Sequence, residues 1–276
     1  MKLEIVDVFA ERRYQGNQLA VVRHAEILPA ATMLAIAREM NFSETTFVHE
    51  PDAASEQDRR REVPVRIFTP AEELPFAGHP VLGTAWALCR GAFPVRLVVP
   101  AGRVEVWFDD GLAWLQPPPP HLGSPIAADI AARIVGLDAT VLDPELPARQ
   151  LRCGPAFCFV AVKSLEALAA VRAEAGELAR LGVTGFPFVV CGKAHSGDAH
   201  YAARMQFFDG VGLREDPATG SANAAFAAYL RALGKRGHFI VEQGVEMGRP
   251  SRIHLEVGES LAVGGRVQPV ATGTLE

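Results

Sequence analysis

The chain has 276 residues, 49% of them hydrophobic and 21% charged, which is enough apolar content for one large domain or two of ordinary size. A net charge of −5 and the lack of a basic cluster exclude nucleic acid and anionic membrane surfaces as expected partners. Because the first ten residues include Glu4 and Asp7 and no long apolar stretch follows, we expect a cytoplasmic protein without a signal peptide or transmembrane helix.

Two further features of the composition indicate ordinary structure. The charged run 58–62 (DRRRE) is short, so a solvated loop is expected there. The four cysteines are scattered without a CxxC pair, and we expect buried free thiols in a reducing compartment. They are Cys89, Cys153, Cys158 and Cys191.

The N-terminal half begins with two strands and a helix. Apolar residues at 3–8 and 19–22 predict the strands, with a turn signal at 15–17 (QGN) between them. Residues 30–40 predict an amphipathic helix that ends at Asn41. Further strands are expected at 44–48, 63–68, 95–99, 104–108 and 113–115.

A second helix is expected at residues 81–89, after the segment 75–80 (PFAGHP). Pro80 fits at its start, because the missing N–H of proline would be unpaired there in any case. This helix is apolar on nearly every side, and a helix without a polar face must be buried all round. We therefore expect the neighbouring strands to form a sheet that wraps around it.

Four consecutive prolines at 117–120 separate the two halves of the chain. Such a run cannot lie inside a helix or sheet and behaves as a stiff extended connector. We therefore expect an N-terminal lobe at 1–116, completed by a C-terminal strand at about 262–276, and a C-terminal lobe at 117–261.

The second half repeats the plan of the first at an offset of about 140 residues. Gly154 begins a turn and strand as Gly16 does, and Arg204 precedes a strand as Arg66 does. Residues 219–221 (TGS) open a second, mostly apolar helix. The repeat indicates duplication of a strand-rich unit around a central helix.

The starts of the two apolar helices carry the residues best suited to chemistry. The first has Gly78 and His79, and the second follows Asp216 in the segment 214–221 (REDPATGS). A helix N-terminus offers unpaired N–H groups and a partial positive charge to a carboxylate, and glycine lets a ligand approach closely. If a pseudo-two-fold axis relates the lobes, both starts face one cleft and flank a small acid.

Each candidate residue also has an ordinary structural explanation. Asp216 before Pro217 is typical of a turn or a helix cap. Ser221 fits small-residue packing, and His79 fits a hydrogen-bonded structural histidine. Glu44, inside the segment 41–48 (NFSETTFV), fits an exposed strand residue as well as a functional carboxylate.

Together these motifs resemble the PhzF-like phenazine-biosynthesis family, over essentially the whole chain. The resemblance implies a diaminopimelate-epimerase-like fold of the α+β class: two pseudo-symmetric lobes, each a curved mixed β-sheet around a central apolar helix. It also implies a homodimer and no cofactor. The segments that carry it are 15–17, 41–48, 68–70 (FTP), 73–85 (ELPFAGHPVLGTA), 215–222 (EDPATGSA), 243–244 (QG) and 247–251 (MGRPS).

The resemblance also assigns roles to single residues. It implies that Glu44 is the catalytic acid/base, and that His79 and Asp216 bind substrate and assist proton transfer. The cradle for the substrate carboxylate is assigned to Gly78, Thr219, Gly220 and Ser221.

The implied reaction is a proton shift on a small carboxylic acid: Glu44 removes an activated C–H proton and returns it to another carbon. Burial in a closed cleft would have to raise the pKa of Glu44 toward the working pH. Epimerases of related fold use a cysteine at each helix start. This chain has His79 and Ser221 there, so racemisation by two thiols is disfavoured.

Other functions remain open at this point. An amino-acid racemase or epimerase would exchange a proton at one stereocentre, and a non-catalytic relative would only bind a small acid or a protein. His195, Asp198 and His200 are suitable ligands for a divalent metal, but a loop between strands is expected there and no metal site. Dinucleotide binding is disfavoured, since no GxGxxG motif follows a strand.

Overall fold

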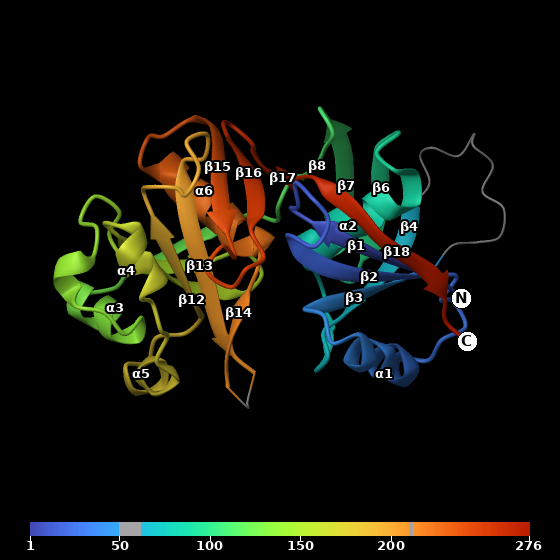
Figure 1. The fold of residues 1–276 in the computed structure, drawn as a ribbon, viewed down its shortest axis with the longest axis horizontal. Helices are drawn as coiled ribbons and strands as arrows, with labels where there is room; N and C mark the ends of the chain where they lie inside the picture. The colour runs from blue at the N-terminus through green and yellow to red at the C-terminus, as the bar shows by residue number, and fades with distance from the viewer. Residues whose placement is uncertain (50–61, 210–211) are drawn as a thin grey trace. The chain divides into compact units, whose positions relative to one another are not determined.

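The computed structural model describes residues 1–49, 62–209 and 212–276 (Figure 1). The charged run expected to be a solvated loop lies, apart from its last residue, outside these ranges. The chain divides into two compact units, Met1–Gln116 with Gly264–Glu276, and Pro117–Val263. The first boundary falls where the run of prolines begins. In the described ranges, no helix has the length and apolar character needed to cross a membrane.

The N-terminal unit is built on one mixed sheet. β2 and β3 are parallel, as are β4 and β6, whereas β1 with β18 and with β2, β4 with β3 and with β5, and β7 with β6 and with β8 are antiparallel. Across the sheet the strands are β18 (Val267–Thr274), β1 (Lys2–Val8), β2 (Asn17–Arg23), β3 (Glu44–Val48), β4 (Glu62–Phe68), β6 (Val95–Val99), β7 (Gly102–Asp109) and β8 (Leu112–Leu115), with β5 (Glu73–Leu74) as a hairpin partner of β4.

The C-terminal unit repeats this order of pairings, which confirms the internal repeat. β11 and β12 are parallel, as are β13 and β15, in the positions that correspond to β2–β3 and β4–β6. Across this sheet the strands are β9 (His121–Pro125), β10 (Arg149–Arg152), β11 (Ala156–Val162), β12 (Phe186–Cys191), β13 (Tyr201–Phe208), β15 (Gly237–Gln243) and β16 (Ser251–Val257), with β14 (Leu213–Asp216) as a hairpin partner of β13.

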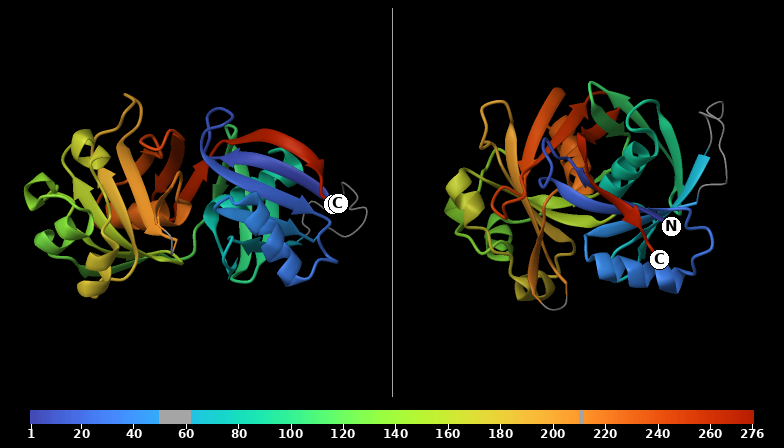
Figure 2. Two further views of the ribbon diagram at one scale, coloured as in Figure 1. Left: turned by 60° about the horizontal axis from the view of Figure 1, so that its bottom comes forward. Right: turned by 45° about the vertical axis from the view of Figure 1, so that its right-hand side comes forward.

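The C-terminal strand closes the N-terminal unit. After β17 (Leu261–Gly265), β18 pairs along the whole length of β1. Figure 2 shows the two chain ends close together, where the ammonium group of Met1 donates to the carbonyl of Leu275 at 2.9 Å. One lobe is thus assembled from both ends of the sequence.

One apolar helix lies at the centre of each unit. α2 (Gly78–Cys89) packs against β1, β2, β6 and β8, and α6 (Gly220–Ala232) packs against β9, β10 and β16. The expectation that both helices are buried is confirmed. The expected start of the first at residue 81 was wrong, because Pro80 needs no N–H partner in the first turn and the helix begins before it, at Gly78.

Smaller helices cover the other face of each sheet (Figure 1). In the N-terminal unit, α1 (Ala30–Met40) packs Met33 and Ala37 against Val22, Phe47 and Phe68. In the C-terminal unit, apolar residues of α3 (Ala128–Ile134) and α4 (Leu165–Ala169) pack on the outer residues of β11 and β12. The remaining short helices are η1 (Ala139–Val141) and α5 (Ala175–Arg180). Each sheet is therefore covered on both faces.

All four cysteines are buried free thiols, as expected. Burial raises the pKa of Cys153 and the pKa of Cys158 to about 12. These two thiols are therefore uncharged at neutral pH and unsuited to taking up a proton as a base.

Candidate active site

Glu44 is positioned by the turn that ends α1. The cap residue Asn41 has a left-handed backbone with φ of 51°, and its N–H donates to the carbonyl of Ala37. The chain then enters the sheet at Glu44, the first residue of β3, beside Leu19 of β2. The Glu44 side chain is 15% exposed, so it is a largely buried carboxyl and not the exposed strand residue of the ordinary explanation.

His79 comes to Glu44 from the first turn of α2. Its side chain is only 6% exposed, and its Nε2 atom lies 3.5 Å from Oε2 of Glu44. Its Nδ1 atom lies 3.5 Å from Nδ2 of Asn17 at the start of β2. Glu44 and His79 therefore form a pair within the N-terminal unit, and Gly78 precedes His79 as the first residue of the helix.

The imidazole of this pair is neutral. Burial lowers the pKa of His79 to about 3, although a hydrogen bond with the backbone of Gln18 acts in the opposite direction. The 3.5 Å contact with Glu44 is accordingly not a salt bridge at neutral pH, and it is long for a hydrogen bond. The group next to the Glu44 carboxyl at this distance is therefore an uncharged imidazole.

The burial of His79 predicts a pH dependence of stability. The folded protein binds this proton only near pH 3, whereas the unfolded chain binds it near 6.5. Between these values the unfolded state carries more protons, so the free energy of unfolding should fall by up to about 1.4 kcal/mol per pH unit as the pH decreases below 6.5. Urea unfolding at several pH values should show a shallower decrease for His79→Gln. His121→Gln, at an exposed histidine, should keep the slope of the wild type, and an unchanged slope in His79→Gln would contradict the expectation.

Asp216 lies in the C-terminal unit, shortly before the start of α6. It is the last residue of β14, opposite Met205 of β13, and the loop 216–219 leads from it into α6. The N-cap of α6 is Thr219, not Asp216, and the Thr219 hydroxyl donates to Oδ2 of Asp216 at 2.5 Å. Both residues are 8% exposed.

The two central helices begin in the same way. Gly78 and Gly220 are their first residues, and His79 and Ser221 are their second. Ser221 therefore occupies in α6 the position that His79 has in α2. The predicted residues fall into two groups: Glu44, Gly78 and His79 in the N-terminal unit, and Asp216, Thr219, Gly220 and Ser221 in the C-terminal unit.

Sequence reasoning gave no role to three buried amide side chains beside these residues. Asn17 lies next to His79, and Gln243 and Asn223 hydrogen-bond to Thr219. All three are fully buried. Two of them stand in the short motifs QGN and QG, but the sequence alone does not show that these amides are buried beside the site residues.

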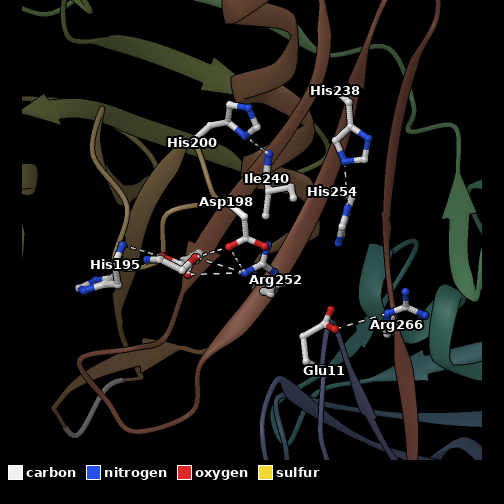
Figure 3. Close-up of polar contacts among 11 residues, drawn as sticks. Glu11, His195, Asp198, His200, His238, Ile240, Arg252, His254 and Arg266 are labelled. Carbon is white, nitrogen blue, oxygen red and sulfur yellow. Dashed lines mark hydrogen bonds and ion pairs between the residues drawn. The ribbon is translucent and has the colours of Figure 1, made fainter.

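The segment with His195, Asp198 and His200 is a loop between β12 and β13, as expected, and its side chains have separate partners (Figure 3). Asp198 forms a paired contact with Arg252, with its Oδ2 atom 2.7 Å from Nη2. His200 accepts a hydrogen bond from the N–H of Ile240, and Nε2 of His195 lies 3.3 Å from Oε1 of Glu246. Within the described ranges, no three His, Cys, Asp or Glu side chains are grouped to hold a metal ion.

Comparison with known proteins identifies the family of this chain. Residues 6–273 match the family model of phenazine biosynthesis-like proteins (PhzC-PhzF). A trans-2,3-dihydro-3-hydroxyanthranilate isomerase of Pseudomonas aeruginosa is 36% identical, with 91% of this chain and 88% of that protein covered.

Two solved structures show the same fold. The structure of a predicted epimerase from Pseudomonas aeruginosa superimposes with a TM-score of 0.81 at 33% identity, covering 99% of this chain and 98% of that one. A hydroxyproline epimerase of Agrobacterium vitis shares the fold alone, with a TM-score of 0.60 at 15% identity over 99% of this chain and 91% of that one. The α+β, diaminopimelate-epimerase-like fold is thereby confirmed. The chain belongs to the PhzF-like phenazine-biosynthesis family and is an isomerase.

Proposed function

We propose that this isomerase moves a proton between two carbons of a small cyclic carboxylic acid, with Glu44 as the acid/base. The observation that carries the proposal is the Glu44–His79 pair, a largely buried carboxyl group 3.5 Å from a neutral imidazole. In the first half of the reaction the Glu44 carboxylate takes a proton from carbon, and the electron pair left behind is delocalised toward the substrate carboxyl group. In the second half the neutral Glu44 returns the proton to another carbon.

For the second group of residues, substrate-binding roles are supported by the family resemblance. Asp216 and His79 bind polar groups of the substrate and orient the carbon from which the proton is removed. Gly78, Thr219, Gly220 and Ser221, at the first turns of α2 and α6, hold its carboxylate. A helix begins with N–H groups that have no partner inside the helix and with a partial positive charge, which supports this role for Gly78, Gly220 and Ser221. The N–H of Thr219 already donates to Gln243, so its place in the cradle is supported by the family resemblance alone.

The proton shift is favoured over racemisation by two thiols. The second positions of α2 and α6 hold His79 and Ser221, and all four cysteines are buried in the two cores. A carboxyl group is therefore the better proton carrier in this chain.

The proposal is tested with trans-2,3-dihydro-3-hydroxyanthranilate, the compound named for the relative that is 36% identical. Incubation in D₂O, followed by NMR, should give an isomer in which a double bond has shifted. Deuterium at the carbon that receives the proton would show that the proton on Glu44 exchanges with water before its return, and ¹H there would show direct transfer. Exchange at a single stereocentre of an amino acid, with no shift of a double bond, would indicate a racemase instead. If neither this compound nor a panel of cyclic unsaturated acids isomerises, the proposed substrate class is wrong.

We also propose that the protein is a homodimer in the cytoplasm. The family resemblance supports the dimer, and four free thiols are compatible with a reducing compartment. Light scattering coupled to size-exclusion chromatography measures the mass directly, and a monomer mass at micromolar concentration would refute the dimer.

A further inference from the structure

Two motifs of the sequence, QG at 243–244 and MGRPS at 247–251, have no role in the proposed reaction. Gln243, the first residue of QG, lies on β15, and Ser251, the last residue of MGRPS, lies on β16. Both form hydrogen bonds with the loop 216–219, which carries Asp216 in the same unit. We propose that Gln243 is a positioning residue, which holds this loop together with Gly244 and Ser251 and directs the Thr219 hydroxyl at Asp216. Its importance for turnover rests on the proposed role of Asp216.

Every hydrogen-bonding position of the Gln243 side chain has a partner in Asp216, Thr219 or Asn223. Its Nε2 atom donates to the backbone carbonyl of Asp216 and to Oγ1 of Thr219, both at 2.9 Å. Its Oε1 atom accepts from the N–H of Thr219 at 3.2 Å and from Nδ2 of Asn223 at 3.1 Å. A glutamine amide has two donors and two acceptor positions, so none is left over. The backbone partners fix its orientation, because a carbonyl only accepts and an N–H only donates.

This contact sets the direction of the Thr219 hydroxyl. Because Nε2 of Gln243 donates to Oγ1, the hydroxyl hydrogen points away from Gln243, and it is donated to Oδ2 of Asp216 at 2.5 Å. The amide, the hydroxyl and the carboxylate form a chain of hydrogen bonds in which each polarises the next. Without the amide, Thr219 can turn its hydroxyl elsewhere and release Asp216.

The backbone beside Gln243 is shaped to receive the same loop. Gly244 has φ of 76°, and a Cβ atom there would lie 2.7 Å from the carbonyl oxygen of Pro217 and 2.5 Å from that of Arg249. Only glycine allows this close approach. The hydroxyl of Ser251 donates to the same Pro217 carbonyl at 2.7 Å. The strand residues Gln243 and Ser251, with Gly244 directly after β15, therefore hold the loop 216–219.

The N-terminal unit has a similar arrangement behind its own site residue. Asn17 is fully buried with its amide nitrogen 3.5 Å from Nδ1 of His79. It follows Gly16, whose φ is 71° and whose missing Cβ would lie 2.3 Å from the carbonyl oxygen of Val8. A buried amide beside a glycine thus lies next to a proposed site residue in both units.

The first test compares two leucine substitutions by amide hydrogen exchange, which needs no substrate. Gln243→Leu should increase the exchange rate of the Thr219 amide by about tenfold or more, since that N–H loses its acceptor. The matched control is Gln206→Leu. Gln206 is also a buried glutamine of this unit, but it accepts from the N–H of Ala173 and donates to the carbonyl of Val171. The control should leave Thr219 unchanged, and equal protection of Thr219 in Gln243→Leu and wild type would overturn the proposal.

The second test separates positioning from a general loss of stability, with trans-2,3-dihydro-3-hydroxyanthranilate as the probe. Gln243→Leu and Thr219→Val should each lower kcat/KM by about 10²-fold, the cost of a small misplacement of a reacting group. The double variant should lose less than the product of the two single losses, because both changes break the same chain of hydrogen bonds through the Thr219 hydroxyl. Fully additive losses would show that Gln243 does not act through this hydroxyl.

A third variant, Gln243→Glu, adds a pH signature. The ionised carboxylate of this variant would accept a hydrogen bond from the Thr219 hydroxyl, which then no longer donates to Asp216. The protonated carboxyl group would instead donate to Oγ1 of Thr219, as the amide of Gln243 does. Activity relative to wild type should therefore rise as the pH falls, and Gln243→Leu should show no such recovery. Parallel pH profiles of the two variants would refute the directional role. Because exchange at Thr219 is measured without turnover, a failure of the proposed reaction remains distinguishable from a failure of this proposal.

Discussion

Glu44→Gln is expected to bind the substrate and to turn it over about 10³-fold more slowly than the wild type. The substitution keeps the size and polarity of the side chain but removes its capacity to accept and return a proton. The neighbouring imidazole cannot take over readily, because burial lowers the pKa of His79 to about 3. The measurements are the initial rate with trans-2,3-dihydro-3-hydroxyanthranilate and the uptake of deuterium from D₂O.

The control for this variant is Glu105→Gln. Glu105 is an exposed carboxylate on β7 of the same unit, and its loss should leave turnover unchanged. Ligand affinity separates the two explanations for an inactive Glu44→Gln, since a misfolded site would lose binding as well as rate. Full activity in Glu44→Gln would contradict the assignment and make Asp216 the next candidate for the proton carrier, which Asp216→Asn would then test.

Patterns in the sequence predicted the elements and their repetition well. The apolar residues of α2 and α6 indicated two buried helices, because neither helix has a polar face. The segment 41–48 gave the strand β3 with Glu44 as its first residue. These features depend on short-range periodicity and on turn residues, which a single sequence displays directly.

Contacts between distant segments were not predictable in the same way. The neutral state of His79 depends on burial by strands that precede and follow α2 in the chain. The hydrogen bonds of Gln243 reach back to Asp216 and Thr219, and no local pattern distinguishes them from those of an ordinary buried glutamine. The start of α2 was predicted three residues late, because the proline was taken as the beginning of the helix and not as part of its first turn.

The internal repeat provides a matched pair of ion pairs. Arg66 of β4 binds Glu73 of β5 through Nε and Nη2 at 2.7 and 2.6 Å, and Arg204 of β13 binds Glu215 of β14 through the same atoms at 3.0 and 2.6 Å. Each pair fixes the hairpin that leads into a central helix. Their surroundings differ, since the first pair is about one third exposed, at 30% and 32%, and the second is only 10% and 12% exposed.

This difference in burial predicts a difference in energy. Nη1 of Arg204 also donates to the carbonyls of Leu168, Ala169 and Val171, so the guanidinium is held in place and cannot move to water if its counter-ion is lost. Glu215→Gln should therefore lower the free energy of unfolding by about 3 kcal/mol, the lower end of the cost of leaving a buried charge unpaired. Glu73→Gln, the same change in the exposed pair, should cost less than about 1 kcal/mol.

Urea unfolding of both variants under identical conditions gives the comparison, and equal losses would contradict it. Glu215→Gln is expected to cost more than Glu73→Gln because of solvent access, since water can replace a lost partner only where it reaches the remaining charge. Two hairpins with the same Arg–Glu pair should thus contribute unequally, and the C-terminal one, which ends in Asp216, should be the more sensitive to substitution.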